Sequence, residues 1–387
     1  MENSTSKISS GADYSLSKAR GTGNTLLVIF LVIWVVAFSA VNLFLRWSIE
    51  QTMFEIEIVN DGRWIVQLAF IVIISIPILI TYFATKVPRL KLMLRLWLIG
   101  CFFALLSVPA KVLYVTDQIQ SYLLLTVVLL VMITTLALLR RVKGVQRGSL
   151  ERSRLTGLAV LAGVALATPW ILWGALGSVL DTVVVFILGI AFAFFLVFSL
   201  FSFYFDDTQP LGGTVNRKEY MFDGLVVAGF LLIVTTGLSQ NGSELLLTMM
   251  LPAAGWLIAA FVTAGKDRRD HGKFAVGVIA AFLLILPLEF FDMDELALII
   301  SGNTNGEVLY WAQRAGMYSL IFLLAIGLAI LVFFRQVERI NTERRINLLL
   351  VLLSGLEIFL LYFNAGQPGF YGDRIFVIMK DQVDVTQ

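Results

Sequence analysis

The sequence comprises 387 residues, of which 58% are hydrophobic and only 14% are charged, and its mean hydropathy is +0.87. Soluble domains contain about 45–50% apolar and about 25% charged residues. This composition therefore excludes an ordinary soluble protein and indicates a polytopic membrane protein whose main partner is the lipid bilayer.

Cysteine and histidine are nearly absent from the chain, which restricts the chemistry that it can perform. The single cysteine, Cys101, lies in an apolar stretch, so no intrachain disulfide can form. The single histidine, His271, lies among charged residues. No phosphate-binding, dinucleotide-binding or nucleophile-elbow motif occurs in the required context. We therefore expect no metal, no cofactor and no nucleic-acid partner, and the sequence favours a protein that is not an enzyme.

The chain is predicted to begin with a disordered cytoplasmic segment, residues 1–23, which is polar and rich in Ser and Gly. About eleven apolar stretches follow, each near the roughly 20 residues that a membrane-spanning helix needs. Lipid admits only helices or closed barrels, and these stretches lack the alternation of strands. The predicted fold class is an all-α polytopic bundle of about eleven transmembrane helices. The predicted spans are 24–45, 64–84, 92–115, 121–139, 155–176, 180–205, 220–238, 244–265, 273–291, 307–334 and 346–363.

The loops between these spans alternate in charge, which predicts the orientation. Basic loops follow the second, fourth, eighth and tenth spans, with the sequences KVPRLK, RRVKGVQRGSLERSR, KDRRDHGK and RQVERINTERR. The loops on the other side are acidic or neutral. Because basic loops remain in the cytoplasm, the N-terminus is predicted inside and the C-terminus outside, in the plasma membrane of a bacterial cell. The predicted transmembrane domain is 24–364, and an extracytoplasmic tail, 365–387, follows it.

Prolines lie near the predicted outer end of several spans. Neighbouring helices can satisfy the backbone groups that a proline leaves free, so these residues can be tolerated without consequence. Alternatively, they kink a set of helices open toward the outer leaflet. The residues are Pro109, Pro169, Pro252 and Pro287.

Three charged residues, Lys111, Arg314 and Glu357, lie inside apolar stretches in the predicted outer half of the membrane. Each shares a helix face with polar or aromatic residues, such as Tyr318 beside Arg314 and Ser354 beside Glu357. Such charges need a partner or water. One hypothesis is an interhelical salt bridge that fixes the packing. Another is a polar cavity, open to the outer leaflet, that binds a polar or anionic group. Lys111 alone can also extend to the interface.

An acidic cluster follows Pro287 on the predicted outer side. Paired carboxylates can perform acid–base chemistry or hold a divalent cation. A solvated acidic loop is the simpler interpretation, because the topology permits it on this side. The residues are Glu289, Asp292, Asp294 and Glu295.

The C-terminal tail contains the segment IFVIMKDQVDVTQ, residues 375–387. It resembles the first strand of the inhibitor-type propeptide of secreted bacterial subtilisin-like serine proteases, which has the form F-V-V-L-K-D-Q-A-D-V-S. The rest of that family's propeptide and its catalytic motifs are absent, so no site residue carries over. The resemblance implies that the chain is the membrane part of a protein with an extracytoplasmic C-terminal module.

Three functions are consistent with these patterns. The first is a non-catalytic membrane protein that carries an extracytoplasmic protein module. The second is a transporter or lipid-handling protein that uses an outer polar cavity around Lys111, Arg314 and Glu357. The third is a membrane transferase that acts on a lipid-linked substrate through the outer carboxylates Asp292 and Asp294.

Overall fold

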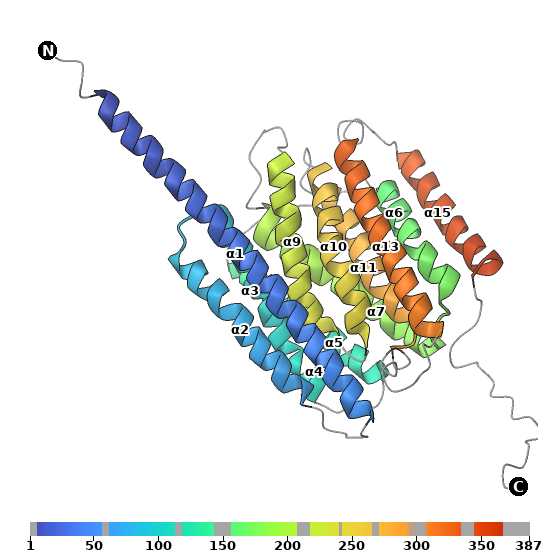
Figure 1. Cartoon of the computed structure of the whole chain (residues 1–387). Helices are drawn as coiled ribbons and strands as arrows, with labels where there is room; N and C mark the ends of the chain where they lie inside the picture. The colour runs from blue at the N-terminus through green and yellow to red at the C-terminus, as the bar shows by residue number, and fades with distance from the viewer. Residues whose placement is uncertain are drawn as a thin grey trace, which may run out of the picture.

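The computed structural model describes residues 6–55, 62–112, 118–142, 156–206, 217–239, 242–264, 271–293, 296, 307–333 and 344–366. These residues form a bundle of helices and contain no strand (Figure 1). Eleven of the helices are long and apolar enough to cross a membrane. The prediction of an all-helical bundle with eleven such helices is therefore confirmed. The extracytoplasmic location and the propeptide-like strand of the tail concern residues that lie mainly outside the described part.

The helices follow one another in chain order with short connections. They are α1 (Ser6–Glu55), α2 (Arg63–Ala84), α3 (Pro88–Leu106), α4 (Val108–Val112), α5 (Gln118–Val142), α6 (Thr156–Trp173), α7 (Val179–Leu200), the π-helix η1 (Phe201–Phe205), α9 (Arg217–Leu238), α10 (Ser243–Ala264), α11 (His271–Phe290), α13 (Glu307–Val332) and α15 (Arg344–Asn364).

Helix α1 begins earlier than the sequence suggested. It starts at Ser6, so residues 6–23 of the segment that was predicted to be disordered belong to this helix. This segment contains no proline, the residue that breaks a helix most strongly, so a helix can extend backwards from the apolar span. In Figure 1 the first part of α1 projects far beyond the bundle.

Helices α9 and α10 form the centre of the bundle, and they pack closely because a glycine lies at their crossing. A Cβ atom at Gly255 would lie 2.4 Å from the backbone nitrogen of Ala228. Trp97 of α3 closes the other side of α9, where its indole nitrogen donates to the Val226 carbonyl at 2.9 Å. Small residues of this kind allow close approach of helices in lipid, where the hydrophobic effect does not drive association.

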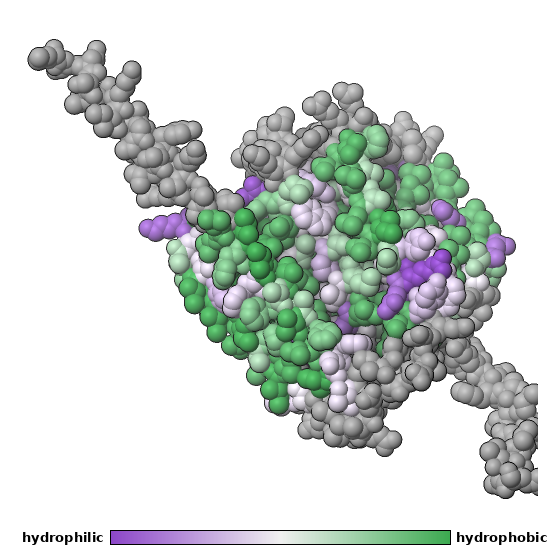
Figure 2. Space-filling view, in the orientation of Figure 1, coloured by the Kyte–Doolittle hydropathy of each residue, from purple (hydrophilic) through white to green (hydrophobic). Residues whose placement is uncertain are grey.

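Helix α15 lies at the edge of the bundle, beside α6 (Figure 1). Only 6% of its apolar window is buried, compared with 67% for α9 and α10. Apolar side chains cover much of the visible flank of the bundle, and a hydrophilic patch interrupts this surface near α13 (Figure 2). Such a surface fits hydrocarbon rather than water as its surroundings.

Of the four prolines, only Pro109 lies next to a break between two helices, as the second residue of α4. The chain turns at Ser107, between α3 and α4, where the predicted third span was continuous. Proline cannot donate a backbone hydrogen bond, which explains the break. The side chain of Gln67 compensates, since its amide donates to the Ala104 carbonyl at 2.7 Å and to the Ser107 hydroxyl at 2.9 Å. The other three lie inside α6, α10 and α11.

Candidate functional site

The site begins with Arg314, which lies two turns into α13 on the half-buried flank of the bundle. Its guanidinium carbon lies 5.1 Å from the ring centroid of Trp173, 5.7 Å from that of Trp311 and 5.9 Å from that of Tyr310. One guanidinium nitrogen also donates to the Tyr310 hydroxyl at 3.1 Å. Within the described part of the chain, Arg314 forms no ion pair with a carboxylate. The cation is therefore held by aromatic faces and keeps donors for another acceptor.

The aromatic rings around Arg314 come from two helices, which fixes their arrangement. Trp173, the last residue of α6, stacks on Trp311 with ring centroids 6.3 Å apart and an interplanar angle of 23°. The ring of Tyr318 also packs on Trp173, with ring centroids 5.2 Å apart. The sequence placed Tyr318 beside Arg314 correctly, because both lie on one helix. It did not indicate Trp173, because only the packing of α6 on α13 brings that ring to the cluster.

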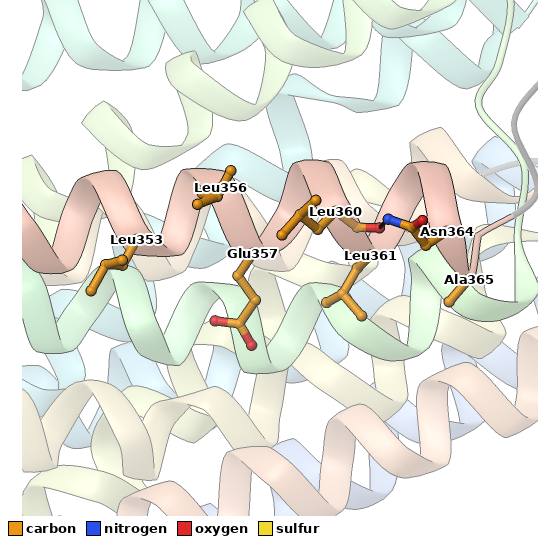
Figure 3. A pocket seen from close by; sticks show the side chains of 7 residues that line it. All are labelled: Leu353, Leu356, Glu357, Leu360, Leu361, Asn364 and Ala365. Atoms are coloured by element: carbon orange, nitrogen blue, oxygen red, sulfur yellow. Dashed lines mark hydrogen bonds between the residues drawn. The ribbon is translucent and has the colours of Figure 1, made fainter.

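Glu357 and Ser354 lie on α15, but they face different surroundings. Ser354 is buried, and its hydroxyl has no hydrogen-bond partner among the described residues. Glu357 is exposed and lines a shallow pocket together with apolar side chains of the same helix and Asn364. Figure 3 shows its carboxylate pointing away from α15 and over the neighbouring helix, on which α15 packs. An interhelical salt bridge was one hypothesis for the three predicted charges, and none is formed between Arg314 and Glu357 in the part of the chain that the structure describes.

Lys111 does not join this group. It lies in α4, which packs mainly on α2, whereas Arg314 and Glu357 lie on helices that pack on α6. Its side chain is outside the described part. The three predicted charges therefore do not form one cluster, because the sequence gives the depth of a residue but not the side of the bundle on which it lies.

Arg314 and Glu357 lie on α13 and α15, which both pack on α6, and we refer to the surface of α6 between these two helices as the groove beside α6. One side of α6 faces α13, through Trp173 and the Leu166 carbonyl, which accepts from Ser319 at 3.5 Å. Another faces α15, where Gly157 contacts Asn347. Between these two sides runs a partly exposed strip, which consists of Leu161, Ala165, Thr168 and Leu172.

Helical geometry places both charges on this side of α6 at similar depth. Glu357 is about 60° around α15 from the buried Ser354, at 100° per residue, and this rotation turns it toward the strip. Arg314 lies seven residues from the start of α13, and Glu357 lies seven residues from the end of α15. Each is thus about 10 Å from the predicted outer end of its helix.

The outer acidic cluster is not a single solvated loop. Glu289 is 1% exposed, and its carboxylate accepts a hydrogen bond from the Thr182 hydroxyl. Its carbonyl accepts from the Gly177 nitrogen at 3.0 Å. Glu289 therefore joins α11 to the start of α7, which corrects the interpretation of this residue as part of a solvated loop. Asp292 is partly exposed, and Asp294 and Glu295 lie outside the described residues.

The sequence patterns did not reveal a buried ion pair between α1 and α10. Arg46 donates to Glu244 at 2.9 Å, to the Thr236 carbonyl at 2.6 Å and to the Ser239 carbonyl. The side chains of Arg46 and Glu244 are 1% and 4% exposed. The predicted first span ended just before Arg46. The signal that identifies this residue is the polar stripe Ser39, Asn42 and Arg46, which lies on one face of α1.

Two arginines near the opposite end of the bundle are bonded to carboxylate or backbone carbonyl oxygens rather than held over aromatic rings alone. Arg89 pairs with Asp223 at 3.0 Å, and Asp223 also accepts from the Tyr204 hydroxyl at 2.6 Å. Arg95 donates to the Phe203 carbonyl at 2.6 Å. These contacts connect α3 with η1 and α9, so they serve packing.

In the described part of the chain, no three His, Cys, Asp or Glu side chains are grouped to hold a metal ion. The helices, their length and their apolar surfaces are compatible with a multi-pass membrane protein. No family model, curated protein or solved structure matches the chain. Function is therefore inferred from the groove beside α6.

Proposed function

We propose that this chain is a multi-pass membrane protein that binds an amphiphile with an anionic headgroup at Arg314, on the outer side of the bilayer. The observation that carries the proposal is the guanidinium held over three aromatic rings without a carboxylate partner among the described residues. A guanidinium presents a planar fork of donors that matches a phosphate group. Indole and phenol rings are favoured where a bilayer changes from hydrocarbon to headgroups.

The groove beside α6 gives the hydrocarbon part of the ligand a place to lie. Its floor is formed by Leu161, Ala165, Thr168 and Leu172, and its wall on α15 is lined by leucines. An acyl chain that lies along this floor leaves its phosphate near Arg314. This arrangement supports the lipid-handling alternative among the functions that the sequence allows.

The test is the retention of defined lipids by the purified full-length protein. After delipidation, the protein is mixed with phosphatidylglycerol or with diacylglycerol that has the same acyl chains, and bound lipid is counted by native mass spectrometry. We expect retention of the phospholipid and loss of at least about tenfold in affinity for Arg314→Gln, because a charge-assisted hydrogen bond is removed. Arg314→Lys should retain less than the wild type, since an ammonium group has no planar fork of donors to bind two phosphate oxygens at once.

A matched control is available at the opposite end of the bundle. Lys91 lies over the ring of Tyr82 at 5.2 Å, which is also a cation–π contact on an exposed surface. Lys91→Gln should leave retention unchanged. Equal retention by wild type and Arg314→Gln would contradict the proposed function.

A further inference from the structure

We propose that a second binding site, at the predicted cytoplasmic end of the bundle, holds the headgroup of an anionic phospholipid. The site lies around the π-helix η1, which forms the last turn of the span that begins at α7. Cationic side chains from three other helices contact this end of the span. They are Arg95 of α3, Arg140 of α5 and Lys273 of α11. This site is separate from the groove beside α6, so it goes beyond the proposed function.

The two arginines lie over neighbouring phenylalanine rings. The guanidinium carbon of Arg140 lies 5.8 Å from the ring centroid of Phe198, and that of Arg95 lies 5.4 Å from the ring centroid of Phe203. The two ring centroids are 6.4 Å apart. Arg140 also donates to the Ser202 hydroxyl at 3.0 Å, and Arg95 donates to the Phe203 carbonyl at 2.6 Å. Adjacent residues of η1 therefore hold both guanidinium groups, on two helices that pack on each other.

Lys273 adds a third cation to the same turn, because its ammonium nitrogen lies 5.6 Å from the ring centroid of Phe201. The helix ends around η1 are strongly basic. The first two turns of α3, the last turn of α5 and the first turn of α11 contain six lysines and arginines and no carboxylate. Asp206 and Asp223 offset two of these charges, through Arg140 and Arg89. The remaining excess of positive charge favours an anionic ligand.

The depth of these cations indicates a lipid rather than a soluble anion. Arg95 lies seven residues, about 10 Å, beyond the start of α3 and inside a helix long and apolar enough to cross a membrane. All three cations are half-buried at the surface of the bundle, where a bilayer would place lipid. The Nε–H group of Arg140 has no acceptor among the described residues, and buried donors require one. Guanidinium groups bind phosphate oxygens in pairs, and basic pockets between helices on this side suit phospholipid headgroups.

Lipid counting on the purified full-length protein tests this site. Delipidated protein is mixed with phosphatidylglycerol or with diacylglycerol that has the same acyl chains, and bound lipid is counted by native mass spectrometry. We expect Arg140→Gln and Lys273→Gln each to lower the affinity for one phosphatidylglycerol about tenfold, because each removes a charge-assisted contact. Diacylglycerol should not be retained at η1. Lys91→Gln is the matched control, since Lys91 lies over the Tyr82 ring of α2 and should not affect this lipid.

Double variants separate this site from the groove beside α6. Arg314→Gln should still retain the phosphatidylglycerol at η1, and the variant that combines Arg314→Gln with Arg140→Gln should retain neither lipid. If folded Arg140→Gln and Lys273→Gln both bind as much phosphatidylglycerol as the wild type, the η1 site is refuted, whatever the result at Arg314. Retention of diacylglycerol equal to that of phosphatidylglycerol in Arg314→Gln also refutes it, because the phosphate is then not recognised.

Inorganic phosphate distinguishes a phospholipid from a free anion at η1. The acyl chains anchor the lipid at the surface of the bundle, so millimolar phosphate should not displace phosphatidylglycerol from Arg314→Gln, in which the outer groove no longer contributes. Complete displacement by inorganic phosphate would contradict a phospholipid ligand and assign the site to a soluble anion.

Discussion

At the scale of single residues, the Arg46–Glu244 pair shows how a charge becomes tolerable inside an apolar bundle. The guanidinium reaches one carboxylate and two backbone carbonyls at the end of α9. Breaking a buried pair costs about 3–5 kcal/mol when it leaves the other charge without compensation. The loss of Glu244 and the loss of Arg46 should therefore have different costs, because Arg46 also donates to two backbone carbonyls whereas Glu244 depends on Arg46.

We therefore expect Arg46→Met to lower the free energy of unfolding by about 3–5 kcal/mol. Glu244→Gln should cost less, since its amide oxygen can still accept from Arg46. The readout is thermal exposure of Cys101, the single cysteine of the chain, which is buried and becomes accessible to a thiol-reactive dye on unfolding. Equal melting temperatures for wild type and Arg46→Met would show that the pair does not stabilise the fold.

Single residues also show why part of the site could be predicted. Arg314 and Tyr318 are four positions apart on one helix, so helical periodicity alone brings them together. Trp173 and Glu357 reach the groove only because α6 packs between α13 and α15. Periodicity contains no information about which helices become neighbours, so the sequence could not exclude a salt bridge among charges that lie on different helices of the bundle.

At the scale of helices, glycine positions distinguish tight crossings from open surfaces. At Gly255 an added methyl group would meet the backbone of Ala228, whereas at Gly355 of α15 it would meet no atom within 4 Å other than the backbone of its own helix. Both glycines lie inside helices, so their backbone contributions are comparable and only their surroundings differ.

Alanine at these two positions provides a matched comparison. Gly255→Ala should destabilise the protein by about 1–3 kcal/mol, because α9 and α10 must separate to admit the methyl group. Gly355→Ala should be neutral or stabilise by up to about 1 kcal/mol, because alanine favours the helix. The melting temperature of each variant is measured by the reaction of Cys101 with the thiol-reactive dye on heating. A smaller effect at Gly255 than at Gly355 would contradict the close crossing.

The helices themselves were largely predictable, since apolar runs of membrane-spanning length define them. The residues at which the helices begin and end were less predictable. The third predicted span divides at Ser107 because Pro109 interrupts the backbone, and Gln67 on another helix compensates for the break. The first helix continues to Ser6 because low apolar content does not by itself end a helix. The hydropathy of the sequence does not show where a helix breaks or how far it continues beyond its apolar part.

At the scale of the whole molecule, an odd number of membrane crossings would place the two termini on opposite sides. Loop charges predict the N-terminus inside and the C-terminus outside. A green fluorescent protein fused before Met1 should then fluoresce in the cytoplasm, and alkaline phosphatase fused after Gln387 should be active outside. Phosphatase fused after Phe333, beyond α13, should be inactive because one crossing fewer returns the end to the cytoplasm. An active enzyme at Phe333 with an inactive one at Gln387 would reverse the orientation.

The buried pair of α1 and α10 also constrains how the protein is made. Arg46 and Glu244 are 198 residues apart, and ribosomes add about 5–20 residues per second. If the bundle is inserted in a membrane, the first helix therefore enters it roughly 10–40 s before its carboxylate partner has been synthesised. During this interval Arg46 must remain at the bilayer surface, where its side chain can reach water. Docking of α1 on α9 and α10 is thus a late step of biogenesis, although α1 is the first helix to be translated and also packs on α2.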